Sequence, residues 1–257
     1  MQFSEHGSGP AVLMLHSVPG TTGSFGPLAR ALSSRARALV PAMPGYGASP
    51  RLEPYTHEGV RERIELELEA RGVRSCAIVA HSGGTYRALC LALAGRIRVE
   101  AMVLVGAVAG FDEASRAQYE QLSVAVRGGA DLRPMYRETA TAPGFAARHP
   151  ERMDEILSAV DACPPAVLAD EFHAFAVGED LRPRLGAIEA RTLLLVGEHD
   201  RITPAAWSEE IAARMPAARL QTLAGCGHCS LQEDEDGAIK AVHSFLAAAG
   251  YEGAPRP

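Results

Sequence analysis

Ser82 is the residue whose surroundings most clearly suggest chemistry. It stands in the sequence Ala-His-Ser-Gly-Gly at residues 80–84, after an apolar run at residues 76–79 and before an Ala- and Leu-rich run. A serine between small residues, where a strand passes into a helix, is typical of a nucleophile elbow, a sharp turn that exposes the hydroxyl. Such a turn strains the serine backbone, and Ala80 and Gly84 are small enough to avoid a clash two residues away on either side. The sequence therefore predicts that Ser82 is a nucleophile at the carboxyl end of a central strand.

A serine hydroxyl needs a base, a group that orients the base, and donors for an oxyanion before it attacks a carbonyl at neutral pH. His228 can supply the base and Asp200 can orient it. Each follows a predicted strand, and both would therefore lie at the carboxyl edge of the sheet, where open α/β sheets place their sites. The three residues occur along the chain in the order Ser, Asp, His. The structural alternatives are helix caps for Ser82 and Asp200 and a surface loop for His228.

Short apolar runs predict the strands that must position these residues. The runs are largely apolar rather than alternating and are bounded by Gly or Pro, as expected for strands buried on both faces of a parallel sheet. They lie at residues 12–15, 37–40, 75–80, 99–105, 192–196 and 219–223. Between or after them, helices are predicted at residues 25–33, 56–71, 85–94 and 236–249, and one more begins at Thr203-Pro204 with the threonine as its cap. This alternation predicts an α/β fold with a doubly wound, mostly parallel sheet.

The pattern breaks between residues 110 and 186, where no strand-like run occurs. The segment instead predicts four helices, at residues 112–127, 131–140, 150–161 and 164–177. We therefore predict a helical cap, or lid, at residues 110–186, inserted into a core formed by residues 1–109 and 187–257.

The order and context of these motifs resemble the α/β-hydrolase superfamily, and more closely its capped serine esterases and lactonases. The resemblance extends over residues 12–249. Besides Ser82, Asp200 and His228, it includes residues 16–20, His-Ser-Val-Pro-Gly, which resemble the family's His-Gly-x-Pro-Gly oxyanion loop. Residues 44–49, Pro-Gly-Tyr-Gly-Ala-Ser, are similar to the family's Pro-Gly-x-Gly-x-Ser loop.

Three positions depart from the family pattern. Ala80 replaces the first glycine of Gly-x-Ser-x-Gly, and its methyl group is tolerable there. Ser17 replaces the glycine that follows the histidine of the oxyanion loop, so its hydroxyl is an additional candidate donor. Ala42 stands where the family often has Asp, which should alter loop packing more than chemistry.

The resemblance implies a two-step acyl transfer without a cofactor or a metal. His228 would take the proton from Ser82 while Asp200 holds the imidazole, and the N–H groups of Gly83 and Val18 would bind the oxyanion. Water activated by His228 would then release the acid. Some family members carry the acid after an earlier strand, which makes Asp112 the alternative to Asp200.

The cap is expected to shape the substrate site. The predicted substrate contacts are Ser17, His81, Tyr119, Tyr136 and Phe172, with His81 also interpreted as a packing residue. The aromatic and aliphatic content of the cap predicts an apolar small-molecule substrate. One of eight cap arginines could meet a substrate carboxylate; these are Arg116, Arg127, Arg133, Arg137, Arg148, Arg152, Arg182 and Arg184.

Composition excludes several other classes of function. The 257 residues, 47% of them hydrophobic, suit one globular domain, and the net charge of −6 with scattered arginines argues against a nucleic-acid partner. The sequence has neither a signal peptide nor an apolar run long enough to cross a membrane, so we expect a cytoplasmic protein with no membrane partner. Five cysteines favour free thiols, and Cys226 with Cys229 is too small a set for zinc. The sequence leaves open whether the protein forms a homodimer.

The sequence therefore predicts a serine hydrolase that cleaves a carboxylic ester, lactone or thioester. A carbon–carbon bond hydrolase, a perhydrolase or an acyltransferase could use the same three residues and stays an alternative. A ligand-binding protein without catalytic activity is the alternative from a different class.

Overall fold

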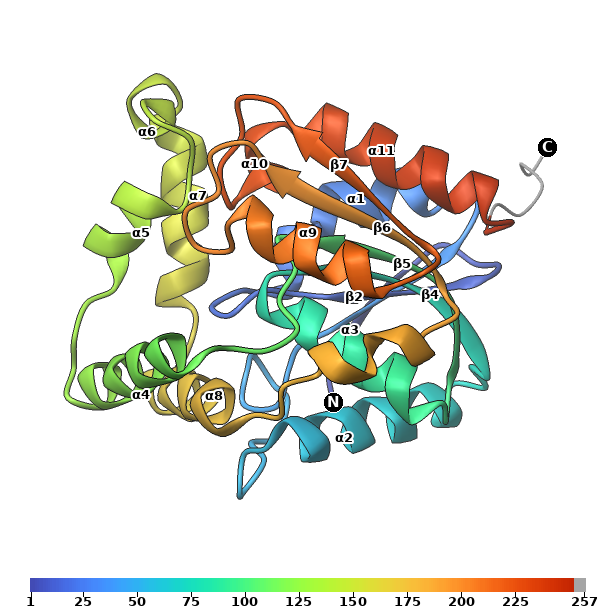
Figure 1. Ribbon diagram of the computed structural model, residues 1–257, viewed down its shortest axis with the longest axis horizontal. Helices are drawn as coiled ribbons and strands as arrows, with labels where there is room; N and C mark the ends of the chain where they lie inside the picture. The colour runs from blue at the N-terminus through green and yellow to red at the C-terminus, as the bar shows by residue number, and fades with distance from the viewer. Residues whose placement is uncertain (252–257) are drawn as a thin grey trace.

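One seven-stranded sheet forms the centre of the molecule, in a computed structural model that describes residues 1–251 (Figure 1). The sheet confirms the predicted α/β class. The strands are β1 (Phe3–His6), β2 (Ala11–Leu15), β3 (Arg37–Pro41), β4 (Ser75–His81), β5 (Arg98–Val105), β6 (Arg191–Gly197) and β7 (Ala218–Leu223). All six predicted strands are present, with ends shifted by one residue at most.

The strand order explains where a site can form. The order across the sheet is β1-β3-β2-β4-β5-β6-β7, and neighbouring strands are parallel except β1 and β3. The chain passes from β2 outward to β3 and then returns to place β4 on the other side of β2. The loops after β2 and β4 therefore leave the sheet in opposite directions, and a crevice can open between them.

The sequence analysis missed β1. Its residues Phe-Ser-Glu-His do not form an apolar run, because an edge strand with one partner needs little burial on its outer side.

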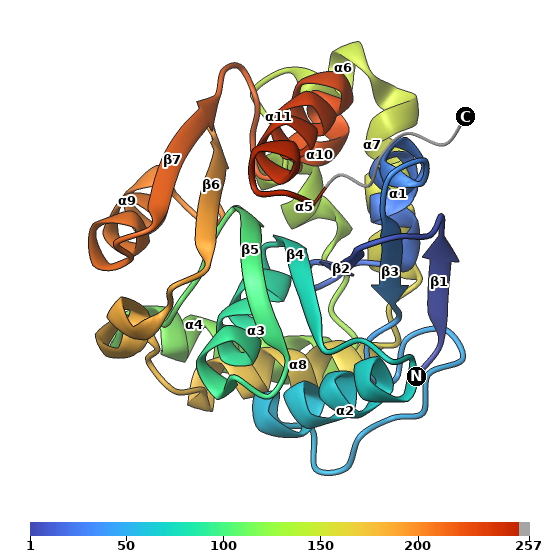
Figure 2. The ribbon, with the colours of Figure 1, turned by 90° about the vertical axis from the view of Figure 1, so that its right-hand side faces the viewer.

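Helices cover both faces of the sheet (Figures 1 and 2). One face packs against α1 (Gly26–Leu32) and α11 (Glu235–Ala248), with Phe25 and Phe245 in its buried cluster. The other face packs against α2 (His57–Ala70), α3 (Gly83–Ala94) and α9 (Ala205–Arg214). These are the predicted helices, although the one expected at residues 25–33 divides into a 3-10 turn, η1 (Thr22–Phe25), and α1.

The segment between β5 and β6 contains only helices and connecting loops. They are α4 (Glu113–Arg127), α5 (Arg133–Thr139), α6 (Phe145–Arg148), α7 (Pro150–Asp161), α8 (Pro165–Val177) and η2 (Arg182–Ala187). Figure 1 shows α4 to α8 gathered beyond the end of the sheet toward which β6 points. A further short helix, α10 (Ser230–Glu233), precedes α11 and contacts α7. The sequence analysis did not predict the short elements α6, η2 and α10.

A buried ion pair joins this helical segment to the core. Arg87 on α3 donates to the Glu171 carboxylate on α8, and the side chains of both are almost completely buried. The hydroxyls of Tyr46 and Tyr55 donate to the same carboxylate. Burial, together with the Glu171 charge, raises the pKa of both phenols well above their usual value, so they remain protonated donors. The ion pair between Glu171 and Arg87 therefore links α8 to α3.

We expect Glu171→Ala to lower the free energy of unfolding by about 3–5 kcal/mol, because Arg87 would keep its charge without a buried partner. Urea unfolding measures this loss. Asp170→Ala is the matched control on the same helix, since Asp170 pairs with the more exposed Arg51 and Arg127, whose ion pairs water screens. Equal losses in the two variants would contradict a dominant role for the buried pair.

Candidate active site

Ser82 has the strained backbone that its sequence predicts. Its φ of 53° and ψ of −123° make it the one non-glycine residue with positive φ among residues 1–251. The Ser82 N–H donates to the Val105 carbonyl at 2.8 Å, which ties the turn to the end of β5. Such strain persists only where the surrounding structure holds it in place. The residue itself is 6% exposed and lines a cavity at the carboxyl edge of the sheet.

Glycine is required beside this turn because α3 packs directly against the end of β2. A Cβ atom at Gly84 would lie 2.2 Å from the Leu15 carbonyl oxygen and 2.7 Å from that of His16. A Cβ atom at Gly83 would lie 2.7 Å from Val18 Cγ2. The small residues of the motif therefore let the first turn of α3 approach the loop after β2.

Thr85 fixes the turn from the other side, and the sequence analysis missed it. Its hydroxyl donates to the Ser82 carbonyl at 2.6 Å and accepts from the Val108 N–H at 3.0 Å. Thr85 is fully buried. A threonine inside a predicted helix gives no local signal of this role.

The structure brings Asp200 and His228 together, although 28 residues separate them. His228 Nδ1 lies 2.9 Å from Asp200 Oδ2 and 3.1 Å from Oδ1. A carboxylate only accepts, so Nδ1 carries the proton and Nε2 is left with a lone pair when the ring is neutral. Asp112, the alternative acid, is exposed and caps α4 by accepting from the Ser115 N–H.

Hydrogen bonds keep the Asp200 carboxylate ionised and in place. Burial raises the pKa of Asp200, but the His228 ring and the hydrogen bonds from Thr203 outweigh it and leave the pKa below its usual value. Oδ1 accepts from the Ile202 and Thr203 N–H groups, and Oδ2 accepts from the Thr203 hydroxyl at 2.8 Å. The prediction that Thr203 caps the following helix is wrong. Pro204 occupies the cap position of α9, and the Thr203 hydroxyl is held by the carboxylate instead.

His81 contacts His228. It was predicted as a substrate contact, but it is not among the residues that line the cavity at Ser82. Its Nε2 lies 2.9 Å from the His228 carbonyl oxygen, and the two rings are 4.9 Å apart. Burial lowers the pKa of His81 to about 3, so the ring is neutral and Nε2 is the donor. His81 is the last residue of β4, and its ring is occupied by this contact with the loop that carries His228.

Glu233 on α10 is a second positioning residue that sequence reasoning missed. It accepts from the Gly227 N–H at 2.9 Å and from the Ala142 N–H at 2.7 Å. The loop that carries His228 is thereby tied to the chain between α5 and α6.

His16 organises the loop after β2. Its Nδ1 donates to the Ser17 carbonyl at 2.8 Å, and its Nε2 accepts from the Met43 N–H at 3.2 Å. Burial lowers the pKa of His16 to about 4, consistent with this neutral form. The Ser17 hydroxyl donates to the Pro19 carbonyl at 2.7 Å and lies outside the cavity lining. Ser17 was predicted as a substrate contact, but its hydroxyl is occupied within its own loop and the residue does not line the cavity.

A cavity of about 350 Å³ opens at Ser82 and Gly83. The predicted contacts Tyr119, Tyr136 and Phe172 line it, and all three come from the helical segment. Val18 lines it from the loop after β2. The cavity therefore lies between the turn at Ser82 and helices α4, α5 and α8.

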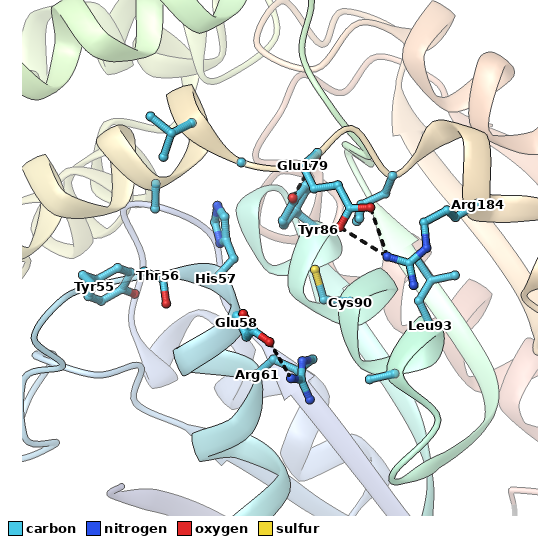
Figure 3. Close-up of a pocket in the computed structure, with 15 residues that line it drawn as sticks. Tyr55, Thr56, His57, Glu58, Arg61, Tyr86, Cys90, Leu93, Glu179 and Arg184 are labelled. Carbon is cyan, nitrogen blue, oxygen red and sulfur yellow. Dashed lines mark hydrogen bonds and ion pairs between the residues drawn. The ribbon is translucent and has the colours of Figure 1, made fainter.

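A larger pocket, of about 640 Å³, lies between α2, α3 and the end of α8 and does not contain Ser82 (Figure 3). An aromatic wall separates the two spaces. His57 and Tyr86 line the larger pocket, and their ring centroids lie 4.6 Å and 5.9 Å from that of Phe175, which lines the smaller one. Volume alone would select the larger pocket, whereas the position of Ser82 makes the smaller cavity the candidate site.

Across residues 1–251, no group of three or more His, Cys, Asp or Glu side chains is arranged to hold a metal ion. Cys226 and Cys229 are free, buried thiols whose pKa burial raises above the usual value. In the same part of the chain, no helix is both long enough and apolar enough to cross a membrane.

Comparison with known proteins identifies the relatives of this chain. A sequence model of the alpha/beta hydrolase family matches residues 12–241. A pimeloyl-(acyl-carrier protein) methyl ester esterase of Xanthomonas campestris pv. campestris is 28% identical, over 96% of this chain and 99% of its own. A 2-hydroxymuconate semialdehyde hydrolase of Pseudomonas putida is 30% identical, over 95% of this chain and 86% of its own. A thermophilic esterase from Thermogutta terrifontis shares the fold, with a TM-score of 0.90 at 22% identity, over 96% of this chain and 93% of that one.

We expect Gly84→Ala to destabilise the protein by about 1–3 kcal/mol, because the new methyl group would force α3 away from the Leu15 carbonyl. Urea unfolding measures the effect. Gly186→Ala is the control, since its Cβ atom would meet nothing closer than 3.7 Å. An unchanged Gly84→Ala variant would show that the helix does not need this close approach.

Proposed function

The chain belongs to the alpha/beta hydrolase family and is an enzyme of that family, and from this premise we propose that it cleaves a carboxylic ester, lactone or thioester through an acyl-enzyme on Ser82. The observation that carries the proposal is the positive φ of Ser82, a strained and largely buried serine that lines a cavity. Backbone strain of this kind is maintained at sites where function needs it.

The proposed base is His228. With Nδ1 protonated and held by Asp200, its Nε2 lone pair is the group that would accept the Ser82 proton during attack on the substrate carbonyl. The ionised Asp200 would then stabilise the imidazolium that forms. After the alcohol leaves with that proton, His228 would activate a water molecule that hydrolyses the acyl-enzyme and regenerates Ser82.

The proposed oxyanion hole consists of the N–H groups of Gly83 and Val18. Gly83 is the first residue of α3, and helix N-termini leave their first N–H groups without intrahelical partners. The close approach of Gly83 to Val18 supports pairing their donors. The Ser17 hydroxyl is not part of this proposal, because it donates to Pro19.

We further propose that residues 110–186 act as the cap and that the substrate is small and largely apolar. Support comes from Tyr119, Tyr136 and Phe172, which reach the cavity from that segment, and from its volume of about 350 Å³. Cavities of 300–1,000 Å³ suit small molecules.

A carbon–carbon bond hydrolase is the second candidate. The observation in its favour is the similarity to the 2-hydroxymuconate semialdehyde hydrolase, whose named substrate has no ester group. A perhydrolase or an acyltransferase would use the same three residues with a different second nucleophile. Turnover of esters against carbon–carbon substrates of matched size separates these possibilities.

We expect Ser82→Ala to lower ester turnover by on the order of 10⁴–10⁶-fold, because the nucleophile is removed. A fluorophosphonate probe should label the unaltered protein at Ser82, as peptide mass spectrometry can establish. If the protein only binds a ligand, the unaltered protein should not turn over esters. Undiminished turnover in Ser82→Ala would reject the proposal.

The two acids can be distinguished in the same assay. We expect Asp200→Asn to lower kcat by roughly 10⁴-fold, because the amide would favour the wrong tautomer of His228. Asp112→Asn, at the exposed cap of α4, should leave kcat nearly unchanged. The reverse result would transfer the role of the acid to Asp112.

A further inference from the structure

We propose that Arg201 binds an anionic group of the substrate, and that the preferred substrate is a small ester, lactone or thioester bearing a carboxylate a few atoms from the reacting carbonyl. This inference rests on the proposed function of Ser82, since it concerns the same cavity. Nothing in the sequence pattern had distinguished Arg201 from the other arginines.

The charge of the cavity wall supports this assignment. Arg201 is the one charged residue among those that line the cavity, and no carboxylate lines it. The other lining residues are apolar or carry neutral polar groups, such as Gln118 and Thr139. An anion that enters this cavity therefore meets one cation and no like charge.

Arg201 also lacks a carboxylate partner of its own. Within the part of the chain that the structure describes, its guanidinium donates to the Glu138 carbonyl in the last turn of α5 and forms no ion pair. A guanidinium has five N–H donors, so most remain available to a ligand. The Glu138 contact holds the side chain without neutralising it.

The cap arginines that the sequence suggested for this role are placed elsewhere. None of the eight lines the cavity. Five of them pair with carboxylates, namely Arg127, Arg133, Arg137, Arg182 and Arg184. The other three, Arg116, Arg148 and Arg152, donate to backbone carbonyls. The cationic residue that lines the cavity is instead Arg201, which follows Asp200 in the loop between β6 and α9.

This position places the charge close to the proposed reaction. The Asp200 carboxylate contacts His228, and Arg201 follows it in the loop between β6 and α9. The same loop reaches α5 through the Glu138 contact. Arg201 could therefore have a purely structural role, as a link between the core and α5, and the experiment must separate that role from ligand binding.

The test compares two esters that differ only in charge at the far end of the acyl chain: monomethyl adipate and methyl 5-carbamoylpentanoate. We expect the unaltered enzyme to prefer the carboxylate ester in kcat/KM by on the order of tenfold, the size of one charge-assisted hydrogen bond at a partly exposed site. Arg201→Gln should abolish the preference, so that kcat/KM falls about tenfold more for the carboxylate ester than for the neutral ester. Arg201→Lys should retain part of it. Added salt should weaken the preference of the unaltered enzyme, because Arg201 is exposed.

A second pair, butyryl glycolate and butyryl glycolamide, carries the charge in the alcohol part and covers the opposite orientation of the ester. Arg137→Gln is the control, since Arg137 lies on α5, pairs with Asp154 and does not line the cavity. It should leave the preference intact.

Calorimetric binding of the same compounds to Ser82→Ala keeps this inference separate from the proposed function. Arg201-dependent binding of the anionic compounds without turnover in the unaltered protein would support the anion site and reject the hydrolase. Neutral-ester turnover with no dependence of either pair on Arg201, in turnover or in binding, would overturn the anion site. Equal losses of kcat/KM for anionic and neutral esters in Arg201→Gln would likewise overturn it. That result would assign Arg201 only the structural role of linking its loop to α5.

Discussion

The close approach of α3 to the end of β2 is the constraint on which the candidate site depends. Glycine at position 84 leaves room for the Leu15 and His16 carbonyls, which any Cβ atom would meet. Because β2 and β4 are neighbouring parallel strands, this approach places the turn at Ser82 beside the loop that begins at His16. The positive φ of Ser82 follows from the same geometry, since the chain must reverse within one residue to enter α3. The strained turn, the proposed nucleophile and the proposed oxyanion donors thus depend on the same close packing of α3 against the end of β2.

The same helix connects the candidate site to the helical segment proposed as the cap. Arg87 lies one turn after Gly83 on α3 and pairs with Glu171 on α8, in a place where neither charge reaches water. A buried charge needs its partner, so α8 cannot leave α3 without a large cost. Phe172 and Phe175 on α8 line the cavity at Ser82. The ion pair therefore sets the distance between the candidate nucleophile and the wall that faces it.

The loops at the carboxyl edge are held by polar contacts rather than by regular structure. Thr203 binds Asp200, Glu233 binds the chain before His228, and His16 bridges the loops after β2 and β3. Each contact uses a buried or half-buried group whose alternative would be an unpaired donor or acceptor, which is costly away from water. Rigid loops of this kind keep the His228–Asp200 pair in one arrangement.

Local pattern was enough for the sheet and for the identity of the candidate residues. Apolar runs predict the five interior strands β2 to β6, because a parallel strand inside the sheet is covered on both faces. The sequence also predicts the edge strand β7, although most of its residues are at least partly exposed, whereas the edge strand β1 has no such run. The small residues around Ser82 predict its strained turn, because the clash that they avoid is local. Of the residues predicted as substrate contacts, Tyr119, Tyr136 and Phe172 line the cavity at Ser82. Ser17 and His81 do not line it, because their side chains contact backbone carbonyls of other residues.

The sequence by itself determined the order of the strands and helices along the chain and the turn at Ser82, because periodicity and residue size act over a few positions. It also named Asp200 and His228, which the structure brings together, as the candidate partners of Ser82. Only the tertiary structure decided which polar side chains meet: Thr203 with Asp200 instead of α9, Arg87 with Glu171, and Arg201 at the cavity in place of a cap arginine. Such pairs depend on how distant elements pack, and a buried charge or hydroxyl takes whichever partner that packing brings within hydrogen-bond distance.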